Sequence, residues 1–223
     1  MAKPEYARDM NPPEGLVAAQ ELARRIVRAI EPLIVAGVTE LELEAQVYRI
    51  ATELGSGPPW TSPTTRIGLG TTVCHPAFPM QDRRGVLGDT VIIDVNPVLD
   101  HWFGDYCETF VIGEDASASE LAAIARQIQL AMIASIVPGM PASDLHRIGA
   151  DLVESRGLKN LDLLDNFGHS LGREFASDGF IDSTNHTPMW GGWTIEPQLG
   201  RHGRGAKYEE IVWISPGRAP SIV

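Results

Sequence analysis

The sequence predicts a mixed α+β fold made of two similar halves, each with two helices and adjoining strands. Helical spacing of apolar residues occurs in two pairs of segments, within residues 15–54 and within residues 117–157. A β-rich hairpin at residues 89–112 lies between the pairs. When the first pair is shifted by 102 residues, four positions match in residue type: Gly37 with Gly139, Leu43 with Leu145, Gly55 with Gly157 and Ala29 with Ala131. We interpret the match as a pseudo-twofold repeat within one domain, not as a solenoid.

Length and composition are those of one globular domain. The chain has 223 residues, of which 43% are hydrophobic and 21% charged, which is sufficient for a large buried core. Residues 1–13 are polar and contain three prolines, so we expect a flexible N-terminal tail followed by a single domain over residues 14–223. No apolar run approaches membrane-spanning length, and the first residues show no signal-peptide hydrophobic region.

Charge and cysteine content restrict the partners and the compartment. The formal net charge of −11 argues against nucleic acid and anionic membranes as partners, and it is compatible with a substrate that carries an amine. Two cysteines, Cys74 and Cys107, do not form a disulfide framework. A reducing, cytoplasmic compartment is therefore expected.

The helices are predicted from their apolar stripes and from their end signals. Thr39 and Glu42 form a capping box that opens the second helix, and glycines mark the ends of the first, second and fourth. Ser117 and Glu120 form a similar box at the start of the third helix. Between the second helix and the hairpin, a loop leads to a short strand near residues 67–73.

Asp94 is the unusual residue of the hairpin. It lies in the apolar run of residues 92–95, where a carboxylate needs a partner. If Leu99 and Asp100 form the tip, Asp94 lies opposite Asp105 with Cβ atoms about 5 Å apart. The same register gives two further pairs: Val98 with His101 and Asn96 with Phe103.

Two carboxylates in this position require a positive group between them. No Lys or Arg occurs between Arg84 and Arg126, so a metal ion is the simplest partner. The alternative is that one of the two aspartates is solvated on an exposed sheet face. Leu-Asp is also an unfavourable turn sequence, which leaves room for a bulge in the register.

The last third of the chain supplies further candidate ligands in β-type segments. His169 lies in GHSLG, Glu196 in WTIEPQL, and either Glu209 or Glu210 in KYEEIVWIS. With the two aspartates this makes four carboxylates and one imidazole, a set suited to Mn, Fe, Co or Zn. Four negative charges balance two divalent ions better than one, so the sequence predicts a two-metal site.

These motifs resemble those of the pita-bread (M24-like) metallopeptidases, the family of methionine aminopeptidase, aminopeptidase P, prolidase and creatinase. VIIDVNPVLDHWFGDYCETFVIG resembles the family's Asp…Asp hairpin, GHSLG its Gly-His-Gly-Ile-Gly segment, and WTIEPQL its Thr-Ile-Glu-Pro-Gly segment. KYEEIVWIS resembles the last ligand strand, in which the Tyr-Glu match selects Glu209. The resemblance covers about residues 14–215, in the family's order and spacing.

The resemblance implies a catalytic domain alone, with a curved, mostly antiparallel sheet. It implies two divalent ions that share a bridging hydroxide, held by five ligands: Asp94, Asp105, His169, Glu196 and Glu209. TTVCHP is similar to the Val-Cys-His-Gly segment of methionine aminopeptidases, which implies a catalytic role for His75.

The sequence departs from the family at one position. Relatives carry a second histidine seven residues after the first, where it contacts the scissile group, but this chain has Ala176. His186 or Asp178 are candidates for the vacated space, and the alternative for His186 is a solvated loop histidine. Peptide hydrolysis is thereby put in question, whereas metal binding is not.

Tryptophans are the candidates for the walls of the substrate pocket. Trp60 and Trp102 are the two that we assign to substrate binding, and Trp190 and Trp193 fall in similar segments. Large aromatic side chains serve equally well as plain core, and this alternative stays open.

Three functions follow from these patterns. The first is a dinuclear metal hydrolase that cleaves a C–N bond near the amino end of a small peptide or amino-acid derivative. The second is a non-peptide hydrolase or lyase of the same fold, and the third is a binding module without catalysis. Retention of all five ligands disfavours the third. The oligomeric state is left open, with a homodimer as one candidate.

Overall fold

The computed structural model describes residues 10–74 and 82–223, so residues 1–9 of the predicted tail lie outside the described part. Its helices are α1 (Glu14–Ile30), α2 (Glu40–Glu53), α3 (Ala116–Ser135) and α4 (Ala142–Ser155), with short 3-10 helices η2 (Glu31–Leu33) and η3 (Gly68–Thr72). Its strands are β1 (Thr64–Ile67), β2 (Thr90–Val95), β3 (Val98–Leu99), β4 (Trp102–Phe103), β5 (Tyr106–Val111), β6 (Lys159–Asn160), β7 (His169–Leu171), β8 (Phe175–Phe180), β9 (Gly191–Ile195), β10 (Gln198–Arg201), β11 (Arg204–Lys207), β12 (Glu210–Ile214) and β13 (Ser221–Ile222).

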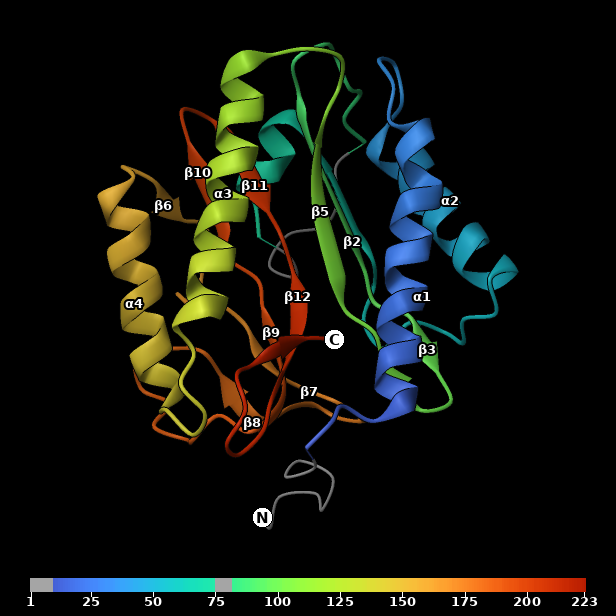
Figure 1. Ribbon diagram of the computed structural model, residues 1–223. Coiled ribbons are helices and arrows are strands. Elements are labelled where there is room, and N and C mark those ends of the chain that lie inside the picture. The colour runs from blue at the N-terminus through green and yellow to red at the C-terminus, as the bar shows by residue number, and fades with distance from the viewer. Residues whose placement is uncertain (1–9, 75–81) are drawn as a thin grey trace.

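The predicted repeat of two halves is confirmed. α1 and α3 begin 102 residues apart, and α2 and α4 both begin and end 102 residues apart. In Figure 1, α1 and α2 lie on one side of the molecule and α3 and α4 on the other, with the strands between them. Both helix pairs pack equivalent apolar side chains against the strands: Ile26, Ile30 and Leu43 with Ile93 of β2 in the first half, and Ile128, Met132 and Leu145 with Ile195 of β9 in the second.

The strands of the two halves meet at the centre of the molecule. The first half forms the antiparallel sheet β1-β2-β5, and the second contributes the order β12-β9-β7 within a larger sheet. An antiparallel bridge between Cys107 and Glu209 joins the two sheets, through Glu209 N–H donating to Cys107 O at 3.0 Å. The join lies where β5 and β12 approach each other, so residues at these two positions face both halves of the chain.

One predicted capping box is confirmed and the other is wrong. Thr39 Oγ1 accepts from the backbone of Glu42 at 3.2 Å, and the Glu42 carboxylate accepts from the backbone of Thr39 at 2.8 Å. At the start of α3, however, the N-cap is Asp115, whose carboxylate accepts from the backbone N–H of Ala118 at 2.8 Å. Asp115 precedes the predicted cap Ser117 by two residues, and a carboxylate also interacts favourably with the positive end of the helix.

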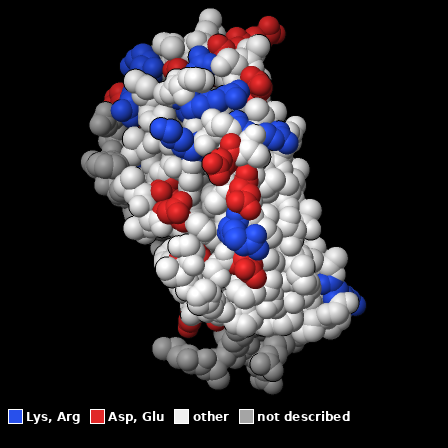
Figure 2. Space-filling view, turned by 90° about the vertical axis from the view of Figure 1, so that its left-hand side faces the viewer, with Lys and Arg blue, Asp and Glu red and all other residues white. Residues whose placement is uncertain are grey.

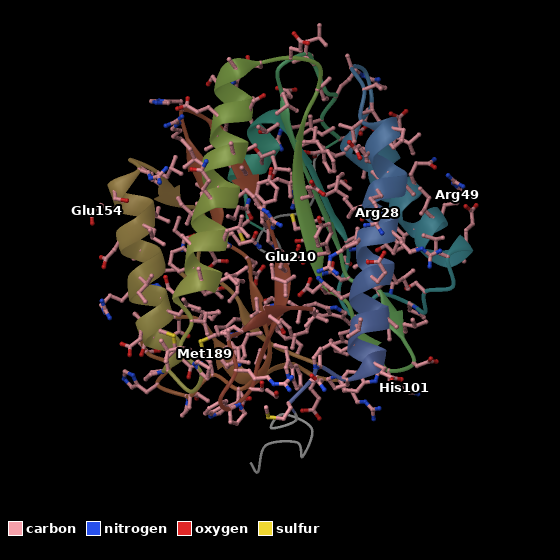
Figure 3. All side chains as sticks on the ribbon, in the orientation of Figure 1. Arg28, Arg49, His101, Glu154, Met189 and Glu210 are labelled. Carbon is pink, nitrogen blue, oxygen red and sulfur yellow. The ribbon has the colours of Figure 1, made fainter. Side chains whose placement is uncertain are left out.

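The predicted hairpin register is wrong by two residues. The tip is Asp100-His101, with φ of 48° and 66°, which is the pair of positive angles that a two-residue type I′ turn requires. Asp94 therefore pairs with Cys107 and not with Asp105. A shift of two residues preserves the face on which each side chain lies, so Asp94 and Asp105 still point to the same side. His101, at the tip, lies at the periphery of the molecule (Figure 3).

The short strand predicted near residues 67–73 lies earlier in the chain. Thr64–Ile67 pairs with β2, and the following residues form the 3-10 helix Gly68–Thr72. Gly68 has a φ of 55°, a left-handed conformation that ends the strand.

The surface carries charges of both signs. On the side of the molecule where α4 lies, groups of Lys and Arg alternate with groups of Asp and Glu (Figure 2). None of the helices in the described ranges combines the length and apolarity that crossing a membrane requires.

Candidate metal centre

The five predicted ligands line a single cavity of about 440 Å³ between the two halves. Asp94 lies in β2 and His169 opens β7, whereas Asp105, Glu196 and Glu209 lie directly beside the ends of β5, β9 and β12. Each ligand is thus held by a strand that is buried on the helix side and open on the cavity side. The structure brings together five residues that are spread over positions 94–209 of the chain.

Asp105 is fixed by its backbone as well as by its side chain. Gln20 of α1 donates from Nε2 to Asp105 O at 2.8 Å and accepts from Asp105 N–H at 2.9 Å. Asn96 Nδ2 donates to Asp105 Oδ1 at 2.7 Å, which leaves Oδ2 without a hydrogen-bond partner among the described residues. The remaining oxygen therefore faces the cavity with its lone pairs free.

His169 presents a ring nitrogen to the same place. Nδ1 lies 3.2 Å from Ser170 O, a carbonyl that can only accept, so this contact assigns the proton to Nδ1. Nε2 then carries a lone pair and lies 3.4 Å from Asp105 Oδ2 and 3.5 Å from Glu196 Oε1. Burial lowers the pKa of His169, which favours this neutral state.

Gly168 allows the His169 segment to approach the neighbouring strand. Its φ is 145°, and a Cβ atom at this position would lie 2.0 Å from Thr194 O. A residue with a side chain would therefore displace the histidine from the cavity.

Glu209 and Glu210 point to opposite sides of the strand. Glu209 lines the cavity, and neither of its side-chain oxygens has a hydrogen-bond partner among the described residues. Glu210 lies on the helix side, where its carboxylate accepts from Arg24 at 2.6 Å and from Arg126 at 3.5 Å. Figure 3 shows Glu210 near the centre of the molecule, between the two helix pairs. The structure thus places Glu209 with the other candidate ligands and gives Glu210 a structural ion pair.

The electrostatics of the cavity favour a cation. Atoms of Asp105, His169 and Glu209 lie within 4.8 Å of one another, and all three residues are buried. Burial and the neighbouring carboxylates raise the pKa of both Asp105 and Glu209 well above the ordinary range. Three buried carboxylate oxygens without a hydrogen-bond partner among the described residues and an imidazole lone pair fit a divalent ion.

Lys207 is the site residue that the sequence analysis missed. Its Nζ lies 2.7 Å from Asp94 Oδ2, 2.7 Å from Glu196 Oε2 and 3.2 Å from Glu209 Oε2. Burial disfavours the ammonium ion, but these carboxylates outweigh burial and raise the pKa of Lys207 well above its ordinary value. The same contact lowers the pKa of Glu196 against the effect of burial. The signal was present, because strand alternation places residue 207 on the same face as residue 209.

Aromatic side chains form one wall of the cavity. The Trp60 ring stacks on Phe175 at 5.1 Å and on Phe103 at 5.6 Å, and Phe180 lies edge-on to Phe175 at 5.7 Å. Trp60 Nε1 donates to Gly104 O at 2.9 Å, which fixes the indole. Trp60 was predicted from sequence, whereas the three phenylalanines were not.

Several predicted substrate residues lie elsewhere. Trp102 does not line the cavity, but packs in the core beneath the guanidinium of Arg173 at 4.6 Å. His186 Nδ1 lies 3.0 Å from Ser143 Oγ at an exposed position, and Ala176 is not part of the cavity wall. His75 lies outside the described residues.

This arrangement has counterparts among known proteins. Residues 14–216 match the family model described as metallopeptidase family M24. An uncharacterized peptidase of Staphylococcus aureus is 25% identical over 201 residues, which cover 88% of this chain and 56% of that relative. The Xaa-Pro dipeptidase of Pyrococcus furiosus is 27% identical over 217 residues, which cover 94% of this chain and 60% of that relative. The chain therefore spans little more than half the length of these relatives.

Solved structures share the fold. The prolidase from Pyrococcus furiosus superposes with a TM-score of 0.84 at 24% identity, over 96% of this chain and 64% of that chain. A methionine aminopeptidase from Thermotoga maritima superposes with a TM-score of 0.79 at 24% identity, over 96% of this chain and 98% of that chain.

Proposed function

The chain belongs to metallopeptidase family M24, and we propose that it is a metal-dependent hydrolase of the aminopeptidase type. The reaction is cleavage of a C–N bond near the amino end of a small peptide or amino-acid derivative. The observation that carries this proposal is the group of buried oxygens without a hydrogen-bond partner among the described residues, Asp105 Oδ2 and both Glu209 oxygens, beside the lone pair of His169 Nε2.

Asp105, His169 and Glu209 would hold the ion, with Glu196 Oε1 beside the imidazole. A divalent ion supplies Lewis-acid polarisation of a carbonyl and lowers the pKa of water, so that attack on an amide proceeds near neutral pH. Gln20 and Asn96 fix Asp105 through three hydrogen bonds, so the ligand geometry is set before substrate binds. The sequence predicts two ions. This number stays a prediction, and Lys207 affects it because its ammonium group contacts the predicted ligands.

The cavity walls suit a small substrate with an apolar group and a free amine. Trp60 and Phe175 offer an apolar surface at one side. The cavity lining contains five carboxylates and two basic side chains, Arg66 and Lys207, and this excess of acidic groups favours a protonated amine over an acidic group.

A non-peptide hydrolase or lyase of the same fold is the second candidate. Ala176 stands where relatives carry the histidine that contacts the scissile group. The described cavity wall contains no imidazole besides His169, and Phe175, the neighbour of Ala176, faces the cavity instead. An apolar side chain in this place cannot donate a hydrogen bond to a peptide amide.

The test is hydrolysis of a panel by chelated protein reloaded with Mn²⁺, Co²⁺ or Zn²⁺. The panel contains Xaa-Pro and Met-Xaa dipeptides, amino-acid amides and the same compounds with acetylated amines. We expect turnover of compounds with free amines, loss of turnover on chelation and in Glu209→Gln, and no loss in Glu154→Gln, an exposed control on the outer side of α4 (Figure 3). Absence of metal-dependent turnover on every peptide and amide would refute hydrolysis and leave the lyase branch.

A further inference from the structure

We propose that Lys207 takes the place of one metal ion, so that the chain binds a single divalent cation beside a built-in ammonium group. The proposal deepens the proposed function and rests on it. The ammonium nitrogen lies 2.7 Å from Asp94 and 2.7 Å from Glu196, the two predicted ligands that come from equivalent places in the two halves. These residues are 102 residues apart, at the spacing of the repeat.

Both oxygens of Asp94 already accept a hydrogen bond. Oδ2 accepts from Lys207 Nζ, and Oδ1 accepts from Asn96 Nδ2 at 3.3 Å. The group of closely spaced metal-ligand atoms accordingly contains Asp105, His169 and Glu209, but not Asp94. A second ion at Asp94 would have to displace the ammonium group and would be repelled by it at short range.

Asp105 and Glu209, unlike Asp94, have buried oxygens without a hydrogen-bond partner in the described part of the chain. Asp105 Oδ2 and both oxygens of Glu209 are buried and lack hydrogen-bond partners among the described residues. Buried acceptors in this state require a partner. Lys207 thus pairs with Asp94 and Glu196 at 2.7 Å and reaches Glu209 Oε2 at 3.2 Å, whereas Asp105 Oδ2 and Glu209 Oε1 are left for one cation.

Lys207 is held in place by its backbone. Its N–H donates to Thr109 Oγ1 at 2.8 Å, and its carbonyl accepts from the same hydroxyl at 2.7 Å. This double contact joins Lys207 to β5 of the other half and directs its side chain into the cavity. A mobile surface lysine would lack such anchoring, and this side chain is only 10% exposed.

The repeat explains how a lysine comes to this position. Lys207 follows Asp105 by 102 residues, so the two occupy equivalent positions at the central join. One half therefore supplies a carboxylate for the ion and the other half supplies a positive charge. If both positions carried carboxylates, a second cation would be required to balance their negative charge, whereas the ammonium group of Lys207 supplies a positive charge in its place.

The experiment measures bound Mn²⁺ by equilibrium dialysis with elemental analysis, and its environment by electron paramagnetic resonance. We expect one Mn²⁺ per wild-type chain with the six-line spectrum of an isolated ion. Lys207→Met should bind two ions with the multiline spectrum of a coupled pair, because Asp94 is then free. Lys159→Met removes an exposed lysine and should bind one ion, as in the wild type.

Asp94→Asn provides a second measurement that does not depend on the folding of Lys207→Met. If Lys207 replaces the second ion, Asp94 is not a ligand, and Asp94→Asn retains the single ion of the wild type. Two ions in the wild type, or loss of an ion in Asp94→Asn, would overturn the inference. Two ions together with metal-dependent amide hydrolysis would leave the proposed function intact, whereas one ion without any amide hydrolysis would refute the proposed function alone.

Discussion

Glu209 and Glu210 are neighbours in sequence, yet their replacement by glutamine should have opposite consequences. Glu209 faces the cavity, where neither oxygen has a hydrogen-bond partner among the described residues and Oε2 lies 3.2 Å from Lys207 Nζ. Glu210 faces the helices with two arginine partners. We expect Glu209→Gln to lose bound metal while keeping the fold. Glu210→Gln should keep metal while losing stability.

The magnitudes follow from the contacts. The side chains of Arg24 and Glu210 are 19% and 6% exposed and lie 2.6 Å apart, so this is a largely buried pair. Removal of one partner of a buried pair costs about 3 kcal/mol. For a chain of this length, that corresponds to a melting temperature lower by about 6–12 °C. Asp105 and Glu209 present ligand atoms within 4.8 Å of each other. Burial and neighbouring carboxylates raise the pKa of both groups, so the chelated fold does not depend on a charge at Glu209, and chelated Glu209→Gln should melt no lower than the chelated wild type.

The assay is thermal unfolding followed by circular dichroism, with and without chelator, together with the metal content of each variant. Glu154→Gln, on the exposed side of α4, serves as the control for loss of a surface carboxylate. If Glu210→Gln melts at the wild-type temperature, the ion pair with Arg24 contributes nothing. If Glu210→Gln loses metal and Glu209→Gln retains it, the assignment of the two faces is wrong.

Three further predictions concern the cavity. Burial raises the pKa of Asp105 and Glu209 in the folded chain, so the unfolded chain releases these protons at lower pH, and the chelated protein should lose stability as pH rises above the ordinary carboxyl range. The free energy of unfolding at about pH 5 and about pH 8 measures this loss, and an equal loss in Glu209→Gln would contradict the prediction. Ala176→His should raise turnover of Xaa-Pro or Met-Xaa dipeptides by about 100-fold to 1000-fold if the missing donor limits the reaction, and brisk wild-type turnover without a gain would show a plain aminopeptidase. Phe175→Ala should raise KM for substrates with an apolar side chain by about 3-fold to 10-fold without changing bound metal, and an unchanged KM would remove Phe175 from the binding surface.

Much of the fold was predictable because it depends on local patterns. The apolar stripes and glycine ends placed four helices, and the offset of 102 residues between them predicted the repeat that the structure confirms. The pita-bread family and fold inferred from the motifs are confirmed by the match over residues 14–216 and by the superposition on the solved prolidase. The helices were predictable because the periodicity of apolar residues is visible within short stretches of sequence.

The errors arose where geometry depends on a specific turn. A tip at Leu99-Asp100 predicts the wrong register, because Asp100 and His101 both adopt positive φ and form the turn instead. Aspartate tolerates this conformation better than most residues, a preference that the pattern of strands alone does not reveal. The prediction of a shared face for Asp94 and Asp105 survived, because an even shift does not change the face.

The cavity wall was less predictable than the ligands. A carboxylate inside an apolar run is conspicuous in sequence, but an aromatic residue is not, since core and pocket use the same residues. Trp60 and Trp102 were predicted alike, and only Trp60 lines the cavity. The local sequence does not reveal Lys207 as the partner of Asp94, because the two residues lie 113 residues apart.

The two halves keep equivalent positions on both sides of the central join but use them differently. On the helix side, Arg24 and Arg126 lie 102 residues apart and both donate to Glu210, so one carboxylate pairs with an arginine from each half. On the cavity side, the equivalent residues are Asp105 and Lys207, which carry opposite charges. Two arginines at equivalent positions are sufficient on the helix side, because their role is to stabilise the contact between the two halves. In the single-cation site that we propose, the change of charge at one of the two equivalent positions gives one side of the cavity to the ammonium group and leaves the other to the cation.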